Sequence, residues 1–169
     1  MSAKPLKTSL HGCWLALACA LLPVLSQAAE APTELDRKAA YCLRAVNIGI
    51  QIAKAVIASD PSPDHQQAKI LRPTVEGYDD DIKRLNSYLM PRLPTLEPQP
   101  ILAAAQRADE DEKLRRGELT ACTTQCAPQA EPGGRRGDKW LACAQACRAQ
   151  SPAFSRMDAC HPAGNWLPS

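Results

Sequence analysis

Two pairs of cysteines with the same spacing constrain this 169-residue chain more than any other feature. Cys122 and Cys126 form one Cx3C unit, and Cys143 and Cys147 form a second unit after sixteen intervening residues. Residues four positions apart lie on one face of an α-helix, so each unit presents both sulfurs to the same side. The Pro- and Gly-rich segment 127–137 suits the turn of an antiparallel helical hairpin. In such a hairpin Cys122 lies opposite Cys147 and Cys126 opposite Cys143, which predicts two nested disulfides.

This twin-Cx3C pattern resembles the helical hairpins of the small Tim chaperones of the mitochondrial intermembrane space and, more loosely, the CHCH proteins. The resemblance covers residues 119–148. It implies a helical hairpin closed by the same two disulfides. Small Tim chaperones are much shorter and lack a cleaved leader, so neither an activity nor a partner is carried over from them.

The first 28 residues have the pattern of an export signal. Two lysines precede the apolar run Cys13–Leu25, and small residues occupy the cleavage-site positions that end at Ala28. We expect cleavage after Ala28 and a mature chain, residues 29–169, that is periplasmic or secreted. Cleavage after Ala31 and lipid attachment at Cys19 are the alternatives. No later run approaches the roughly 18 apolar residues of a membrane span, so we expect no transmembrane segment in the mature chain.

Export changes both the charge and the cysteine count. Removing the leader leaves 18 basic residues against 18 acidic ones, so the mature chain is near neutral. A nucleic-acid-binding protein would show a strong basic surplus. Six of the eight cysteines remain, and an even number in an exported chain indicates disulfides. Once the hairpin pairs are assigned, Cys42 and Cys160 are left to join the first helix to the C-terminal segment.

Apolar periodicity predicts an all-α fold: one small, disulfide-stapled bundle of about four helices. The first helix should start after an N-cap at Thr33 and end before Asp60-Pro61. The second contains Pro73, so we expect one kinked helix or two short ones. Asp138 is expected to cap the fourth helix. The predicted helices cover about 34–59, 64–90, 100–126 and 139–149, with an extended Pro-rich connector at 91–100 and a short helical piece at 152–159.

Two acidic runs, Asp79–Asp81 and Asp109–Glu112, are candidates for paired carboxylates. Neighbouring residues on a helix point in different directions, and basic residues follow the second run at helical spacing. We therefore interpret both runs as solvated surfaces. The motifs of zinc proteases, serine hydrolases and phosphate-binding loops are missing from the sequence. Of the two histidines after the leader, His65 is interpreted as a solvated first-turn residue, and His161 carries no haem-attachment motif.

These observations favour an exported helical protein that works by binding, with no catalytic residue, metal ion or cofactor. The expected partner is another protein in the cell envelope or outside the cell, as for an inhibitor, an immunity protein or a secretion accessory, and a homodimer is compatible with the pattern. In the first helix, four residues widen the apolar stripe, so this helix is either deeply buried or offers a face to a partner. The candidate interaction residues are Tyr41, Leu43, Ile48 and Ile52.

Two alternatives stay open. The first is an envelope enzyme of unfamiliar type that uses Asp79, Asp80, Asp81 and His65. The second is a metal- or redox-handling protein that uses the cysteines, because four reduced cysteines can form a tetrahedral zinc site. An oxidising compartment, and Cx3C rather than CxxC spacing, favour disulfides over both uses of the thiols.

Overall fold

The computed structural model describes residues 29–59, 66–130 and 137–168. The expected leader, residues 1–28, and His65 lie outside the described residues. The described ranges contain five α-helices and no β-strand apart from a single bridge between Glu30 and Leu96, which confirms the all-α prediction. The helices are α1 (Glu34–Ala58), α2 (Gln66–Leu89), α3 (Pro98–Cys126), α4 (Asp138–Ala149) and α5 (Pro152–Asp158).

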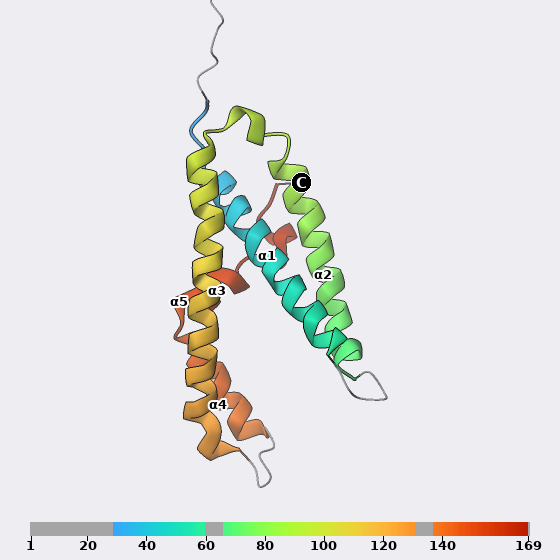
Figure 1. The fold of residues 1–169 in the computed structure, drawn as a ribbon, viewed down its shortest axis with the longest axis vertical. Coiled ribbons are helices and arrows are strands. Elements are labelled where there is room, and N and C mark those ends of the chain that lie inside the picture. Colours follow the sequence, from blue (N-terminus) through green and yellow to red (C-terminus); the bar gives the residue numbers. More distant parts are fainter. Residues whose placement is uncertain (1–28, 60–65, 131–136, 169) are drawn as a thin grey trace, which may run out of the picture.

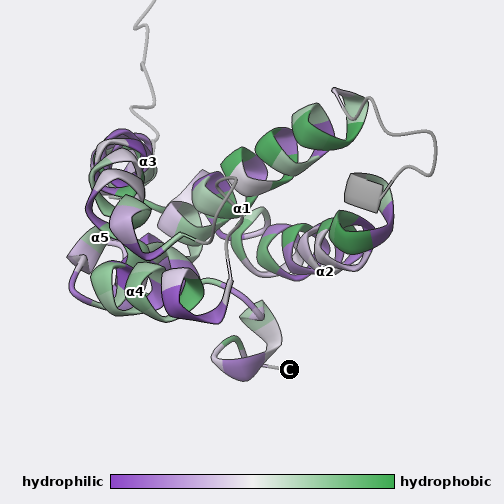
Figure 2. Ribbon diagram, turned by 90° about the horizontal axis from the view of Figure 1, so that it is seen from below, coloured by the Kyte–Doolittle hydropathy of each residue, from purple (hydrophilic) through white to green (hydrophobic). Residues whose placement is uncertain are grey.

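The helix α1 lies between α2 and α3 and packs against both (Figure 1). The longest helix, α3, runs along one side of the molecule, and α1 and α2 lean away from its second half (Figure 1). The helices α4 and α5 fold back against that second half of α3. Hydrophobic residues are concentrated along α1, whereas α3 is mixed along its length (Figure 2).

The start of α1 forms a capping box, which confirms the predicted N-cap. The Thr33 hydroxyl accepts a hydrogen bond from the Asp36 backbone N–H at 3.1 Å, and Asp36 Oδ2 accepts one from the Thr33 N–H at 2.9 Å. Asp36 is fully buried and also accepts hydrogen bonds from Arg92 at 2.6 and 3.0 Å and from the Tyr88 hydroxyl at 3.0 Å. Hydrogen bonds from Arg92 hold the pKa of Asp36 far below its ordinary value, although burial opposes them.

The segment between α2 and α3 differs from the extended connector that its prolines predict. Leu93–Thr95 forms a 3-10 turn, and α3 already begins at Pro98. Proline fixes φ near the helical value and lacks an N–H, so it is well suited to the first turn of a helix. Within α2, Pro73 is accommodated in one continuous helix.

The apolar core is built mainly from small residues of α1 packed against α2 and α3. Two of its members, Ala39 of α1 and Ala108 of α3, are fully buried. The buried core consists of Ala39, Ala40, Cys42, Ala45, Val46, Leu85, Leu89, Leu96, Ile101, Ala108, Cys160 and Ala163.

The composition of α1 differs from the expectation that no segment after the leader is apolar enough to span a membrane. By length and mean hydropathy alone, α1 is apolar enough to cross a membrane. In this structure the same helix has the buried Asp36 in its first turn, packs between α2 and α3, and carries a disulfide at Cys42. These features are those of the central helix of a bundle.

Three disulfides join the helices with the predicted pairing. Cys122–Cys147 and Cys126–Cys143 have Cα–Cα distances of 5.7 and 5.8 Å, and they close the α3–α4 hairpin. The third, Cys42–Cys160, has a Cα–Cα distance of 5.1 Å and joins α1 to the segment after α5. One local prediction is wrong: Gly137, not Asp138, is the N-cap of α4, and Asp138 is the first helical residue.

Candidate functional site

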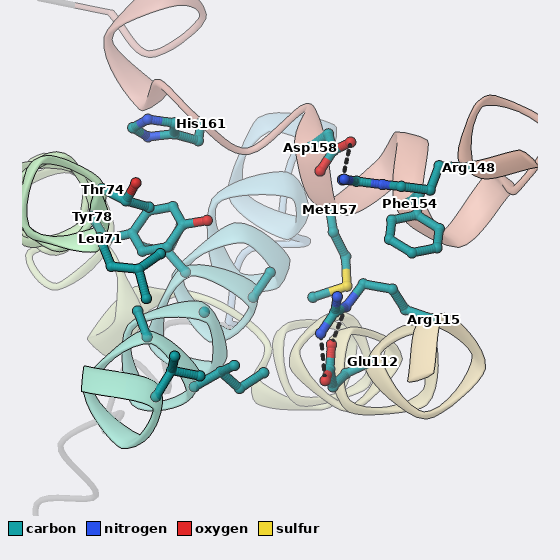
Figure 3. Close-up of a pocket in the computed structure, with 16 residues that line it drawn as sticks. Leu71, Thr74, Tyr78, Glu112, Arg115, Arg148, Phe154, Met157, Asp158 and His161 are labelled. Atoms are coloured by element: carbon teal, nitrogen blue, oxygen red, sulfur yellow. Dashed lines mark hydrogen bonds and ion pairs between the residues drawn. The ribbon is translucent and has the colours of Figure 1, made fainter. Parts of the chain in front are cut away.

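A cavity of about 460 Å³ opens between α1, α2 and the group formed by α3, α4 and α5 (Figure 3). The side chains of α1 form its floor, those of α2 form one wall, and those of the other three helices form the opposite wall. Its lining residues are Ala45, Val46, Gly49, Ile52, Ala53, Val56, Leu71, Thr74, Tyr78, Glu112, Arg115, Arg148, Phe154, Met157, Asp158 and His161.

The floor is wholly apolar because it is the continuation of the α1 stripe. Ala45, Gly49 and Ala53 recur every four residues, so they lie on one helical face. Gly49 permits a close approach of α2, since a Cβ built at this position would lie 2.9 Å from Cε2 of Tyr78. Small residues on α1 therefore set the depth of the cavity, and Tyr78 closes one side of it.

A buried carboxylate fixes the imidazole of His161 at the upper edge of the cavity (Figure 3). Nδ1 of His161 contacts Oδ2 of Asp81, and Oδ1 of Asp81 accepts a hydrogen bond from the Ala163 N–H at 2.7 Å. The ring of Tyr78 meets the imidazole edge-on, with centroids 5.1 Å apart. Burial raises the pKa of Tyr78. Asp81 thus anchors the C-terminal segment to α2, and the Cys42–Cys160 disulfide anchors the same segment to α1.

The opposite wall carries two arginines that face one aromatic ring. The guanidinium carbons of Arg115 and Arg148 lie 5.6 and 4.7 Å from the ring centroid of Phe154. Arg115 donates two hydrogen bonds to the buried Glu112, from Nε at 2.5 Å and from Nη2 at 2.8 Å. Arg148 lies 3.8 Å from a carboxylate oxygen of Asp158, beyond hydrogen-bonding distance.

Glu112 has a second basic partner. Arg116 donates to it from Nε at 2.8 Å. Burial alone would raise the pKa of Glu112, but hydrogen bonds from Arg115 and Arg116 outweigh burial and hold that pKa below its ordinary value. One carboxylate therefore faces two guanidinium groups at this wall.

The interpretation of both acidic runs as solvated surfaces is wrong for Asp81, Asp111 and Glu112, which are at most 3% exposed. Asp111 accepts hydrogen bonds from the Tyr41 hydroxyl at 2.8 Å and from Nε and Nη2 of Arg156 at 2.7 Å each. Hydrogen bonds from Arg156 lower the pKa of Asp111 against the effect of burial. The partners come from α1 and α5, so nothing within α3 itself indicates the burial.

The exposed members of the two runs match the solvated interpretation. Asp80 pairs with Lys83 at 2.9 Å, and Asp109 pairs with Arg44 at 2.7 Å. The buried carboxylates of the two runs do not lie together in one cluster. Asp81 binds the segment at the upper edge of the cavity, whereas Glu112 lies in the wall formed by α3.

The four candidate interaction residues of α1 lie in different environments. Tyr41 is half-buried and bound to Asp111, and Leu43 packs against the core. Ile48 is half-buried, and Ile52 lines the floor of the cavity. Contact of this helix with a partner stays a prediction.

Sequence reasoning did not single out Arg115, Arg148, Phe154 or His161 as parts of one site. The four residues come from α3, α4, α5 and the segment after α5, and only the folding back of the hairpin brings them together. The Cx3C pairing was the one signal that places α4 beside α3. It does not locate α5, which is seven residues long.

The groups that the cavity offers to a ligand follow from its lining. The six cysteines within the described ranges are all in disulfides. Among those same residues, no cluster of three or more His, Cys, Asp and Glu side chains is arranged to hold a metal ion. The cavity provides an apolar surface, two guanidinium groups paired with the carboxylates of Glu112 and Asp158, one imidazole, and the side chains of Thr74 and Tyr78.

Comparison with known proteins returns no matching family, no matching curated protein and no matching solved structure.

Proposed function

We propose that this chain is an exported, non-catalytic binding protein whose disulfide-braced helices hold an apolar cavity for a ligand. The observation that carries the proposal is the cavity itself. Its volume of about 460 Å³ falls in the range of small-molecule sites, and an apolar lining with a few oriented polar groups is typical of such sites.

The covalent connections support this function because they fix the walls before a ligand arrives. Cys42–Cys160 joins the helix that forms the floor to the segment that carries His161. The two hairpin disulfides join α4, which carries Arg148, to α3. A preformed site spends less free energy on ordering its side chains when it binds.

A neutral fluorescent dye tests the cavity without any contribution from charge. The oxidised mature chain should bind Nile red saturably, with one site per chain. Val56→Trp places an indole at the cavity and should weaken this binding at least about tenfold. Ile70→Trp is the matched control, because Ile70 is 68% exposed on α2 and does not line the cavity. Unsaturable binding, or equal binding by both variants, would contradict the proposal.

The export component has its own test. Protein recovered from the envelope or the medium should begin at Ala29, and its mass should be six hydrogens below that of the fully reduced chain. A retained leader or free thiols would contradict the export and oxidation that we propose.

One observation favours a second candidate, an envelope hydrolase. The Asp81–His161 contact resembles the carboxylate–imidazole pair that orients a general base in many hydrolases. An ester or amide substrate whose turnover is abolished by His161→Ala, while Nile red affinity is unchanged, would favour the enzyme. Equal background turnover by the wild-type chain and by His161→Ala would favour the binding role.

A further inference from the structure

We propose that the cavity takes a single-chain carboxylate amphiphile, with its carboxylate at Arg115 and Arg148 and its apolar chain along α1. This inference rests on the proposed binding function and names the ligand class. Three features of the site support it: the hydrogen-bonding state of the two arginines, their position on one side of the cavity, and the size and lining of the cavity.

Both arginines retain hydrogen-bond donors. Glu112 occupies Nε and Nη2 of Arg115, and no partner of Nη1 is found among the described residues. The contact of Arg148 with Asp158, at 3.8 Å, leaves the donors of Arg148 unused within the described chain. Because Glu112 and Phe154 hold these groups in place, a carboxylate that reaches them meets donors that are already oriented.

The guanidinium donors lie on one side of the cavity. Both lining guanidinium groups lie at the wall formed by α3, α4 and α5, where Arg115 pairs with Glu112 and Arg148 lies 3.8 Å from Asp158. At the upper edge, the buried Asp81 lies behind His161. Guanidinium donors for an anionic head are therefore present on one side of the cavity, so the two ends of a ligand are distinguished.

The size and the lining of the cavity suit one flexible apolar chain. Its volume of about 460 Å³ falls in the range of small-molecule sites. The floor offers only aliphatic side chains, and Met157 lies on the opposite wall beside Phe154 and Arg115 (Figure 3). A thioether side chain adapts readily to an irregular apolar ligand.

Titration calorimetry with three ligands of equal chain length tests the head group. Dodecanoate, dodecanol and dodecyltrimethylammonium are each used below their micellar concentration with the oxidised mature chain. Dodecanoate should bind about tenfold or more tightly than the other two, since a charge-assisted hydrogen bond is worth about that factor. Arg148→Gln should remove most of this advantage and leave dodecanol affinity unchanged.

Arg116→Gln is the matched control, because it removes the same charge from a 68%-exposed side chain that does not line the cavity. It should change dodecanoate affinity by less than about twofold, since an exposed charge contributes little. A measurement that needs no variant is the salt dependence, in which added NaCl should weaken dodecanoate binding and not dodecanol binding.

The outcomes separate this inference from the proposed function. Equal affinity for the three ligands, with Nile red still bound, would overturn carboxylate recognition and keep the apolar cavity as the binding site. Absence of binding for all three ligands and for Nile red would overturn both. Weaker binding in Arg116→Gln to the same extent as in Arg148→Gln would reduce the effect to overall charge and refute the site.

Discussion

The Cys42–Cys160 disulfide closes a much longer loop than the two hairpin disulfides, and loop length determines how much each bridge restricts the unfolded chain. Its cysteines are 118 residues apart, and the outer hairpin disulfide, Cys122–Cys147, shortens the loop by 25 residues. The loop-entropy relation then gives about 4.5 kcal/mol at 25 °C for a closed loop of about 93 residues.

The hairpin disulfides are nested, so each is worth less when the other is present. The outer bridge spans 25 residues and the inner one spans 17, so closing the outer bridge over the inner one adds a ring of only eight residues. The same relation gives about 2.5 kcal/mol for that ring. Cys42→Ala/Cys160→Ala should therefore destabilise the protein by nearly twice as much as Cys122→Ala/Cys147→Ala.

Equilibrium urea unfolding of the oxidised mature variants measures both losses, with circular dichroism at 222 nm following the helices. The linear extrapolation to zero urea is compared, because a missing bridge also raises the slope by exposing more surface in the unfolded chain. If the Cys42→Ala/Cys160→Ala variant is already unfolded without urea, the result agrees with the prediction, because the loss then exceeds the total stability. Equal losses for the two double variants would refute the loop-length argument.

Three further predictions concern the buried carboxylates and the helix cap. Asp111→Asn should lower the free energy of unfolding by about 2 kcal/mol, a value discounted because its partner Arg156 is 40% exposed. Asp109→Asn on the same helix should lower it by at most about 0.5 kcal/mol. Similar urea midpoints for the two variants would contradict this. The folded-state pKa values of Asp36 and Asp111 are lowered, so their contribution to stability is present above the unfolded pKa of about 3.9 and is lost as the pH falls below it. Asp36→Asn should accordingly flatten the stability profile between about pH 4 and pH 2 relative to the wild type, and parallel profiles would refute the assignment. Thr33→Ala should cost about 1 kcal/mol in thermal unfolding, whereas an unchanged midpoint would show that the capping box contributes nothing.

Features that depend on neighbours in the sequence could be predicted. The Cx3C spacing determines which sulfurs face each other once two helices are antiparallel, and the N-cap at Thr33 requires only the residues that follow it. The conformation of residues 91–100 was harder to predict, because prolines are compatible with both an extended segment and the first turn of a helix. The contact between Glu30 and Leu96 selects between these conformations, and no local pattern encodes it.

The candidate site depended on contacts that no local pattern encodes. Within α3, the run that contains Asp111 and Glu112 has basic neighbours at helical spacing, which is the pattern of a solvated surface. Arg115 and Arg116 do pair with Glu112 as that pattern predicts. Asp111 and Glu112 are nevertheless buried, and Asp111 is bound by Arg156 of α5, which packs against α3.

The buried acids perform a structural task that the apolar core is too small to perform alone. Leu, Ile, Val and Phe make up only about 16% of residues 29–169, and much of the core is alanine, which removes little apolar area from water. Each buried aspartate joins segments that are distant in sequence: Asp36 joins α1 to the turn after α2, Asp81 joins α2 to the C-terminal segment, and Asp111 joins α3 to α5. A buried carboxylate that loses its partner is costly, so these junctions favour one arrangement of the helices over others of similar apolar burial. The disulfides restrict the unfolded chain, whereas the carboxylates select among folded arrangements, so acid should loosen the cavity walls even while all three bridges remain intact.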